Sequence, residues 1–552
     1  MRFNTPRKTT ATANHQGAEA FALTPQLELY TAVATTALAD SFYEKDADRL
    51  TRIRALIAQN DPHFVAKLAV YAREKMHLRT VPVALAVELA RTHSGNGLVA
   101  TTVGRIVQRA DEIAEVLAYY AQANGRTGTK QLGKLSKQVQ KGLAAAFNKF
   151  DEYQFAKYNR DTSVKLRDAL FLVHPKAKDE VQQAIFDRIV RGKLATPDTW
   201  EVALSRAGQE ANADEAAKAK SKKASWESLI VERKLGYMAL LRNLRNILEA
   251  GVSNEALTMA CAYLSDARAV AGSKQLPFRF LSAYREVKAM GNVAAADTGH
   301  GWNTTATTGL NKLIALARGV VRGDTNHGGR NHADAQGRTG LVLEALETAV
   351  QHSAANIAGY GLETRVVIAA DVSGSMQAAI SPRSTVQRFD IGLMLAMLLQ
   401  HRCKHVTVGM FGDTWKTIAV PKSNILGNVL EFHHREGEVG YSTNGYKVID
   451  GLTARRQVAD KVMMFTDCQL WNSTGTSDTI RTSWAMYKRE VAPAAKLYLF
   501  DLAGHGTTPL SVLRDDVHLI AGWSDKVFDV LHAIDNGHNA VQVIEDLTLA
   551  DG

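Results

Sequence analysis

The sequence predicts a chain of two parts, an all-α amino-terminal part and an α/β carboxy-terminal part. The first prediction rests on apolar residues that recur with i, i+3, i+4 spacing from about Leu27 to about Met290. The second rests on short apolar strands that alternate with helices from Arg365 onward, which is typical of a doubly wound parallel sheet. We therefore expect one domain over 25–360 and another over 361–552.

The amino-terminal part begins with polar, Thr-rich sequence, which predicts a flexible tail over 1–24. Helical spacing is clearest over 53–72 (divided at Pro62), 81–90, 98–121 and 181–189. Successive helices joined by short turns suggest a helical-repeat array. The Ala/Lys/Glu-rich segment 211–223 is either an exposed helix or a loop, and 323–340 lacks an apolar period and predicts a loop before a helix over 341–353.

The carboxy-terminal part shows the strand–helix alternation directly. Strands are expected over 366–370, 406–411, 461–466, 496–502 and 517–521. Helices are expected over 389–402, 446–452, 480–490 and 525–534.

The composition is that of a soluble globular protein, with 46% hydrophobic and 22% charged residues. No apolar run is long enough to cross a bilayer, and the first residues lack the apolar core of a signal peptide. The three cysteines, Cys261, Cys403 and Cys468, are far apart and odd in number, so no disulfide framework is implied. These features indicate a cytoplasmic protein without a membrane partner.

The net charge of +10 is unevenly distributed. Residues 361–552 carry 18 Lys and Arg against 21 Asp and Glu, which leaves 48 basic and 35 acidic residues in 1–360. The excess of positive charge in the first part favours a polyanionic partner there, although a modest lysine excess also serves solubility.

Three oxygen-bearing side chains follow the first predicted strand of the α/β part. Asp371, Ser373 and Ser375 occupy alternate positions of one tight turn. One carboxylate and two hydroxyls suit Mg²⁺, which prefers oxygen ligands and keeps several waters, whereas the simpler interpretation is that they cap the next helix. Thr443 in a Gly-rich loop and Asp467 after another strand would lie at the same edge of the sheet, where such folds bind ligands.

The Asp-x-Ser-x-Ser pattern resembles the metal-ion-dependent adhesion site of von Willebrand factor A domains. The resemblance implies that Asp371, Ser373 and Ser375 act with a Thr and an Asp from two further loops, here Thr443 and Asp467. Ser442 could serve in place of Thr443. The expected cofactor is a divalent cation, with Mg²⁺ ahead of Mn²⁺, and an acidic group from a partner could complete its coordination.

A segment rich in positive charge covers Gly125 to Arg167, with ten basic and three acidic residues. Lys130, Lys134, Lys137 and Lys141 have the spacing of one helical face. Such a face suits phosphates, and the nearby aromatic residues Tyr153, Phe155 and Tyr158 could stack on bases. A solvated surface helix is the alternative interpretation.

The order of several segments resembles the Ro ribonucleoprotein family, whose members join a TROVE module to a von Willebrand factor A domain. The segments include Phe-Ala-Lys-Tyr at 155–158 and His-Pro-Lys at 174–176. The full set lies, in chain order, at 133–147, 155–158, 166–170, 174–176, 238–244, 276–284, 371–376 and 465–467. The resemblance therefore covers most of 25–550 and is closest to bacterial members.

The resemblance implies a monomeric ring of HEAT-like helical repeats closed by the α/β domain. Its implied partners are small noncoding Y-like RNA, the single-stranded ends of misfolded RNA, and an exoribonuclease, and its implied role is non-enzymatic RNA quality control. Lys157, Arg160 and His174 correspond in position to RNA-contacting residues of the family. Asp161 stands where the family has a basic residue, and Tyr-Ser-Thr-Asn at 441–444 replaces the usual Gly-Gly-Thr-Asp, which weakens the assignment of Thr443.

A second function remains open, in which the α/β domain is a metal-dependent protein-interaction module of a chelatase or AAA-associated complex and the helices are only scaffold. The two hypotheses differ over the basic segment, because only the first requires it to bind RNA.

Overall fold

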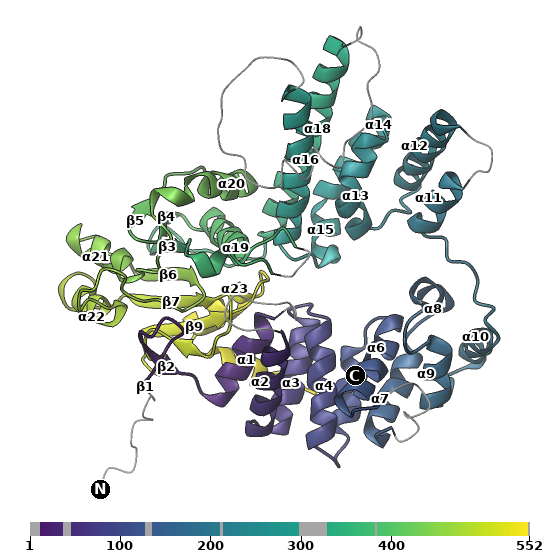
Figure 1. Ribbon diagram of the computed structural model, residues 1–552, viewed down its shortest axis with the longest axis horizontal. Helices are drawn as coiled ribbons and strands as arrows, with labels where there is room; N and C mark the ends of the chain where they lie inside the picture. The colour runs from purple at the N-terminus through teal and green to yellow at the C-terminus, as the bar shows by residue number, and fades with distance from the viewer. Residues whose placement is uncertain are drawn as a thin grey trace. The chain divides into compact units, whose positions relative to one another are not determined.

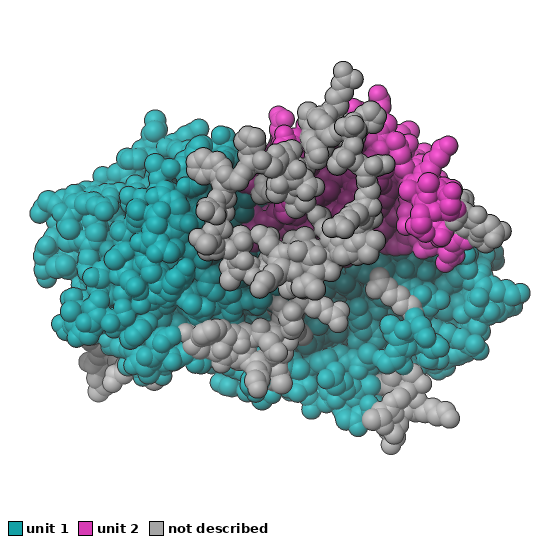
Figure 2. Space-filling model, turned by 45° about the horizontal axis from the view of Figure 1, so that its top comes forward, with its two compact units in different colours: residues 1–198, 276–278, 354–552 teal, residues 199–275, 279–353 magenta. Residues whose placement is uncertain are grey.

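The computed structural model describes residues 11–36, 46–126, 135–159, 161–209, 214–296, 328–380 and 384–549. The chain forms two compact units, whose elements are labelled in Figure 1 and whose surfaces are coloured separately in Figure 2. Unit 1 comprises residues 1–198, 276–278 and 354–552, and unit 2 comprises 199–275 and 279–353. Both ends of the chain thus belong to unit 1.

The first part of unit 1 is helical, which confirms the prediction from apolar spacing. Its helices are α1 (Pro25–Ala34), α2 (Asp46–Gln59), α3 (Pro62–Glu74), α4 (Thr80–Thr92), α5 (Leu98–Ile106), α6 (Ala110–Ala123), α7 (Lys137–Phe147), α8 (Glu152–Tyr158), α9 (Leu166–Val173) and α10 (Glu180–Arg191). Pro62 begins α3, and the side chain of Asp61 accepts the N–H groups of His63 and Phe64 as a cap. Within the described residues, no helix has both the length and the apolar character to cross a membrane.

The single helix predicted over 98–121 is interrupted, because α5 ends at Ile106 and α6 begins at Ala110. The Glu112 carboxylate accounts for the break. It accepts the N–H groups of Gln108 and Arg109 at 2.8 and 3.1 Å. A carboxylate in the first turn that receives N–H groups from residues before the helix starts a new helix at that point.

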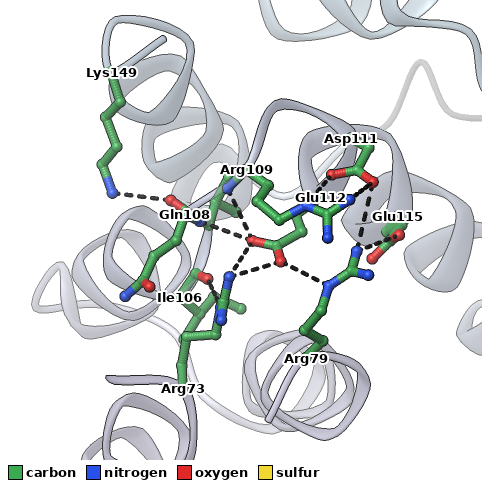
Figure 3. A network of polar contacts seen from close by, with 10 residues as sticks. Arg73, Arg79, Ile106, Gln108, Arg109, Asp111, Glu112, Glu115 and Lys149 are labelled. Carbon is green, nitrogen blue, oxygen red and sulfur yellow. Dashed lines mark hydrogen bonds and ion pairs between the residues drawn. The ribbon is translucent and has the colours of Figure 1, made fainter. Parts of the chain in front are cut away.

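Glu112 also lies at the centre of the ionic network drawn in Figure 3. Arg73 of α3 donates to both of its oxygens, at 2.7 and 3.0 Å, and Arg79 donates at 3.2 Å. Arg73 further donates to the carbonyl of Ile106 at 2.9 Å. Since Arg73 and Glu112 are both buried, this network fixes α6 against the end of α5 and the helices before it.

Unit 2 is helical as well. Its helices are α11 (Trp200–Gly208), α12 (Glu215–Val231), α13 (Tyr237–Glu249), α14 (Asn254–Ser265), α15 (Ala267–Ser273), most of α16 (Phe278–Ala296), and α18 (Gly328–Ser353). The low-complexity segment is helical from Glu215 onward. The loop predicted over 323–340 is wrong for 328–340, which form the first half of α18; residues 323–327 lie outside the described residues. Arg338 attaches this turn of α18 to Asn254 and to the Val252 carbonyl, at 2.6 and 2.7 Å, a tertiary contact that local sequence does not reveal.

A six-stranded sheet forms the core of the later part of unit 1, with strand order β5-β4-β3-β6-β7-β9. The strands are β3 (Arg365–Asp371), β4 (His405–Phe411), β5 (Trp415–Thr417), β6 (Lys461–Thr466), β7 (Lys496–Asp501) and β9 (Val517–Ala521). All are parallel except β5, which runs antiparallel to β4 and was not predicted. The doubly wound sheet is therefore confirmed, and β3 and β6 are neighbours, with Ala370 opposite Phe465.

Helices cover both faces of the sheet. They are α19 (Arg388–Arg402), α20 (Ile425–Arg435), α21 (Tyr446–Ala454), α22 (Ile480–Glu490), α23 (Val527–Asp535) and α24 (Ala540–Glu545), of which α20 and α24 were not predicted. One face packs on α21 through buried Ile449 and on α22 through buried Trp484. On the other face, Phe465 stacks on Phe500, which contacts Phe528 of α23. The polar ends of β3 and β6 thus project from a rigid core.

The segment before α1 is an ordered hairpin. Strand β1 (Ala11–Ala13) pairs with β2 (Glu19–Ala22), and β2 pairs with β8 (Thr507–Thr508). Asn14 in the turn is buried and donates to the carbonyl of Leu470 at 2.9 Å. The flexible tail predicted over 1–24 is therefore wrong for 11–24, because the pairing partner lies near the opposite end of the chain; residues 1–10 lie outside the described residues.

Candidate functional site

The turn after β3 brings together the three residues of the Asp-x-Ser-x-Ser pattern. The N–H of Ser373 donates to Oδ1 of Asp371 at 2.9 Å, and the hydroxyls of Ser373 and Ser375 are 3.2 Å apart. All three residues are buried. The turn is therefore held by its own hydrogen bonds, and the two hydroxyls converge beside the carboxylate.

The next strand of the sheet brings Asp467 to this turn. Asp467 directly follows β6, and the preceding residue, Thr466, donates its hydroxyl to Oδ2 of Asp371 at 2.6 Å. Thr466 was not assigned a role from the sequence, because its only signal was its position at a strand end. It fixes the orientation of the Asp371 carboxylate and joins the two acidic strand ends.

Hydrogen bonds through Gln469 link Thr443 to the turn at Asp467. Its hydroxyl donates to the carbonyl of Gln469 at 3.1 Å, and the N–H of Gln469 donates to Oδ1 of Asp467 at 3.0 Å. Thr443 is buried, whereas the adjacent Ser442 is partly exposed and its N–H donates to Asp413. The geometry thus favours Thr443 over Ser442 as the hydroxyl of this loop.

The buried carboxylates of this cluster are only partly satisfied by hydrogen bonds from the described residues. Burial, and then the charge of Asp467, raise the pKa of Asp371 against the hydrogen bonds from Thr466 and Ser373. Oδ2 of Asp467 is buried and receives no hydrogen bond from the described residues, and the same holds for Oδ2 of Asp501 at the end of β7. Buried charges are costly unless they are paired or coordinate a metal. Two carboxylates with three hydroxyls fit a hard divalent cation such as Mg²⁺.

The basic segment is only partly the helical face that was predicted. Helix α7 begins at Lys137, because Ser136 is extended and its N–H donates to the hydroxyl of Tyr120 at 3.2 Å. Lys137 and Lys141 are exposed on this helix. Lys130 and Lys134, which were predicted to share a helix face with Lys137 and Lys141, lie outside the described residues.

Lys149, two residues after α7, is exposed, but its ammonium group is engaged by backbone carbonyls. Its ammonium group donates to the carbonyls of Gly104 and Val107, the latter at 3.1 Å, as drawn in part in Figure 3. Burial lowers the pKa of Lys149. The side chain thus satisfies the last carbonyls of α5, a structural role that its place in a basic run conceals.

Lys157 lies on α8, exposed between two tyrosines. Its ammonium group is 5.5 Å from the ring of Tyr153 and 5.7 Å from that of Tyr158. Tyr153 is 45% exposed and open to stacking, whereas Arg109 lies 4.3 Å from the Tyr158 ring. Phe155, expected to be available for stacking, is instead fully buried.

His174 ends α9 in a left-handed conformation, with φ of 50°, and its side chain is exposed. It therefore serves as a helix C-cap, which leaves the ring available to a ligand. The side chain of Gln140 donates to the carbonyl of Val173 at 3.1 Å, and Asn148 donates to that of Lys176 at 2.9 Å. These bonds hold the 174–176 turn against α7.

Among the described residues, no carboxylate pairs with Lys137, Lys141, Lys157, Arg167 or Lys176, all of which are exposed. By contrast, Asp161 neutralises Lys165 at 3.0 Å. Arg160 lies outside the described residues. The described residues of helices α7 to α9 and of the turns after them therefore carry several available cations.

Family comparisons cover most of the chain. The TROVE domain matches residues 30–191 and 190–298, and the Ro60 vWA domain matches residues 365–534. The candidate cations of α7 to α9 fall within the first domain and the candidate metal ligands within the second.

Individual proteins show more distant similarity. Telomerase protein component 1 of Mus musculus is 25% identical over 335 residues, and that of Rattus norvegicus is 25% identical over 337 residues. These matches cover 46% and 45% of this chain but 12% of each relative, so the chain spans a small part of their length. The crystal structure of the Deinococcus radiodurans RO (RSR) protein matches with a TM-score of 0.51 and 17% identity, covering 91% of this chain and 97% of that one, which indicates a shared fold.

Proposed function

We propose that this chain, which belongs to the Ro family of proteins with a TROVE domain and a Ro60 vWA domain, is the RNA-binding component of a ribonucleoprotein. Family membership supports this role, and the exposed cations of α7 to α9 provide the surface that would bind RNA. The proposed role is that of a scaffold rather than an enzyme.

The availability of these cations is the observation that carries the proposal. Lys141 and Lys157 are exposed, and neither has an acidic partner among the described residues. Positive charges without acidic partners repel one another when they lie on one surface. Phosphates relieve this repulsion and release their own condensed counterions on binding. Tyr153 beside Lys157 offers a ring on which an unpaired base can stack.

The finer identity of the ligand follows from the family. We propose Y-like noncoding RNA and the single-stranded ends of misfolded RNA as ligands, with an exoribonuclease as the protein that acts on them. The closed, monomeric ring and the cytoplasmic location implied by the resemblance belong to the same proposal. His174 and Arg160 are included as RNA contacts by their position in the family pattern.

The vWA domain is proposed to hold a divalent cation, Mg²⁺ or Mn²⁺. Asp371, Ser373, Ser375, Thr443 and Asp467 would provide its ligands, and the unbonded Oδ2 of Asp467 supports this assignment. The ion would supply a positive charge with open coordination positions to which an anionic oxygen binds. The chain's residues hold the ion, and Thr466 and Gln469 orient its ligands.

RNA binding is tested by charge reversal on the full-length protein. Lys141→Glu combined with Lys157→Glu should weaken the binding of a single-stranded RNA at least about tenfold and reduce the slope of log affinity against log salt by about 1 to 2. Lys404→Glu is the matched control, because this exposed lysine lies in the vWA domain. Unchanged affinity in the double variant, with the fold intact by circular dichroism, would refute the proposed surface.

The alternative function, a metal-dependent protein-interaction module, makes the helical part a scaffold only. RNA that co-purifies with the protein and dissociates in high salt supports the ribonucleoprotein role. A protein that carries no RNA from the cell and has no affinity for RNA in low salt supports the alternative.

A further inference from the structure

Strand β9 is the last strand of the six-stranded sheet, and no described strand pairs with its outer side (Figure 1). The carbonyl of Asp516, just before β9, accepts the N–H of Leu497 in β7 at 2.8 Å. Alternate residues of a strand direct their backbone groups to opposite sides. The N–H and C=O groups of Val517, Leu519 and Ala521 therefore point away from β7, to the outer edge of the sheet.

Tyr30 already satisfies one of these three residues. Its hydroxyl donates to the carbonyl of Ala521 at 2.9 Å and accepts the N–H of Ala521 at 3.2 Å, so it takes the place of a strand residue. None of the described residues bonds to the outward N–H and C=O groups of Val517 and Leu519, which are 0% and 4% exposed. Buried backbone groups are almost always paired, so these four groups need a partner.

A cavity of about 540 Å³ lies along this edge, and Val517, His518 and Leu519 contribute to its lining. Ligand pockets commonly measure about 300 to 1,000 Å³. Burial, and then the charge of Lys496, lower the pKa of His518 to about 4, so its ring is neutral near pH 7. Its buried Nε2 makes no hydrogen bond within the described residues. The cavity thus presents polar groups of the backbone and of a side chain that a ligand can satisfy.

The two walls of the cavity lie on opposite faces of β9. Leu23, Leu27 and Val512 form an apolar wall, and they pack in the core that holds α21 and α22. Helix α24 forms a polar wall through Gln542 and Glu545, and it packs on α23 at the other face of the sheet. Side chains of a strand alternate between its two faces. A strand paired with β9 would therefore place every second side chain against the apolar wall and the others against α24.

The lining carries one charge. Glu545 is the only Asp, Glu, Lys or Arg among the described residues that line the cavity. It is exposed, and its Oε1 accepts a hydrogen bond from Nε2 of Gln26 at 3.0 Å, whereas no basic side chain of the described chain pairs with it. A lysine or arginine of a ligand complements this carboxylate, and a polyanion does not.

We propose that the outer edge of β9 is a docking site for an extended segment of a partner protein in which apolar residues alternate with lysine or arginine. The segment adds a strand to the sheet: its backbone pairs with Val517 and Leu519, its apolar side chains lie against Leu27, and its cation pairs with Glu545. The site lies at the start of β9, away from the carboxyl ends of β3 and β6, and it requires neither a metal ion nor RNA.

Calorimetric titration of the full-length protein in EDTA tests strand addition with acetyl-Val-Lys-Val-Lys-Val-amide. Two further probes carry a single backbone N-methyl group, one on the second residue and one on the third. Because alternate residues of the added strand bond to β9, one N-methylated peptide should bind at least about fivefold more weakly than the parent, and the other about as tightly. Equal affinities of the two N-methylated peptides overturn strand addition.

Variants of the chain locate the site. Gln542→Trp places a large side chain at an exposed position of the cavity lining, so it should weaken binding of the parent peptide at least about tenfold. Gln183→Trp, at an exposed position of α10, is the matched control. Glu545→Lys should reverse the preference for the parent over acetyl-Val-Glu-Val-Glu-Val-amide. Circular dichroism verifies that each variant is folded.

Four results would overturn the docking site. They are absence of binding of the parent peptide at millimolar concentration, unchanged affinity in the folded Gln542→Trp variant, an unchanged charge preference in Glu545→Lys, and binding that appears only when Mg²⁺ is added. A dimer of the native protein in sedimentation that dissociates in the Gln542→Trp variant also overturns the inference, in favour of a second copy of this chain as the occupant.

Discussion

The hydroxyl of Thr466 donates a 2.6 Å hydrogen bond to Oδ2 of Asp371, and this single contact joins the ends of β6 and β3. It orients one candidate ligand, and it places the residue after Thr466, Asp467, beside the other ligands. A hydroxyl at a strand end is therefore as important to the geometry as the carboxylates themselves.

Thr466→Val should weaken Mg²⁺ binding about tenfold or more, because removal of a group that orients a metal ligand typically has this effect. Thermal midpoints measured across a Mg²⁺ titration provide the affinity. Thr453→Val is the matched control, since its hydroxyl bonds only to the carbonyl of Ile449 in its own helix. Equal Mg²⁺ affinity in the Thr466 variant and the native protein would show that the bond does not position the ligand.

The raised pKa of Asp501 predicts that the stability of the metal-free protein depends on pH. Burial raises its pKa from 3.8 to about 6, although the N–H groups of Gly504 and Ala503 lower it. The folded state binds the proton of Asp501 more tightly than the unfolded state does. Protonated Asp501 therefore adds to the free energy of unfolding, and this contribution is fully present below about pH 4 and is lost as pH rises through about 6. The loss is about 3 kcal/mol for a shift of about two units.

Urea unfolding in a chelator measures this dependence. The native protein should lose stability between about pH 4 and about pH 6, and Asp501→Asn should reduce the slope over that interval, with the remaining slope due to Asp371, whose pKa is also raised. Asp515→Asn, a change at an exposed position in the same domain, should leave the curve unaltered. Parallel curves for the native protein and the Asp501 variant would contradict the assignment.

Lys461 should contribute strongly to stability. Its ammonium group donates to Tyr498 at 2.7 Å and to Asp535 at 2.5 Å, and Tyr360 also donates to Asp535 at 2.5 Å. Burial raises the pKa of Asp535, but the hydrogen bonds from Lys461, Tyr360 and Tyr498 outweigh this effect and hold the pKa below its ordinary value. Lys461→Met would leave this carboxylate without its cation, at a cost of about 3 kcal/mol in the free energy of unfolding.

Lys416→Met provides the comparison for that measurement. Lys416 pairs with Glu438 at 2.5 Å, but both side chains are largely exposed. Its loss should therefore lower the free energy of unfolding in urea much less than the loss of Lys461 does, because solvent screens this pair. Similar costs for the two variants would mean that the Lys461 cluster is solvated rather than buried.

Lys141 in α7 and Lys149 in the turn after that helix should respond in opposite ways. Lys149→Met removes the donor to the carbonyls of Gly104 and Val107, so it should destabilise the protein by about 1 kcal/mol or more without changing RNA affinity. Lys141→Glu should weaken RNA binding with little change in stability, because Lys141 is exposed. Filter binding together with urea unfolding separates the two effects, and a loss of RNA affinity in the Lys149 variant would contradict its structural role.

The sequence predicted the parts of the fold that depend on local pattern. The five parallel strands, the helices between them and the turn at Asp371 all follow from apolar runs that end in polar residues. The arrangement of the ligands could also be anticipated, because parallel strands place their carboxyl ends at one edge.

The errors arise where a distant residue decides local structure. The helix predicted over 98–121 is broken by the buried carboxylate of Glu112, and α18 extends back to Gly328, where the contacts of Arg338 hold its early turns. The hairpin at Ala11 to Ala22 exists because Thr507 and Thr508 provide a strand for it. Counting charges likewise could not distinguish Lys149, whose ammonium group donates to the carbonyls of Gly104 and Val107, from Lys141, for which no such bond is seen.

The pairing of both chain ends within unit 1 has a consequence for biogenesis. Tyr30 in α1 donates its hydroxyl to the carbonyl of Ala521 at 2.9 Å, a contact between residues 491 positions apart. At about 5 to 20 residues per second, a ribosome needs about 25 to 100 seconds to synthesise the intervening chain. Unit 2 can complete itself during that interval, while the amino-terminal helices emerge without their sheet. We therefore expect nascent chains of this protein to need protection by chaperones until Ala521 has been synthesised and released from the ribosome.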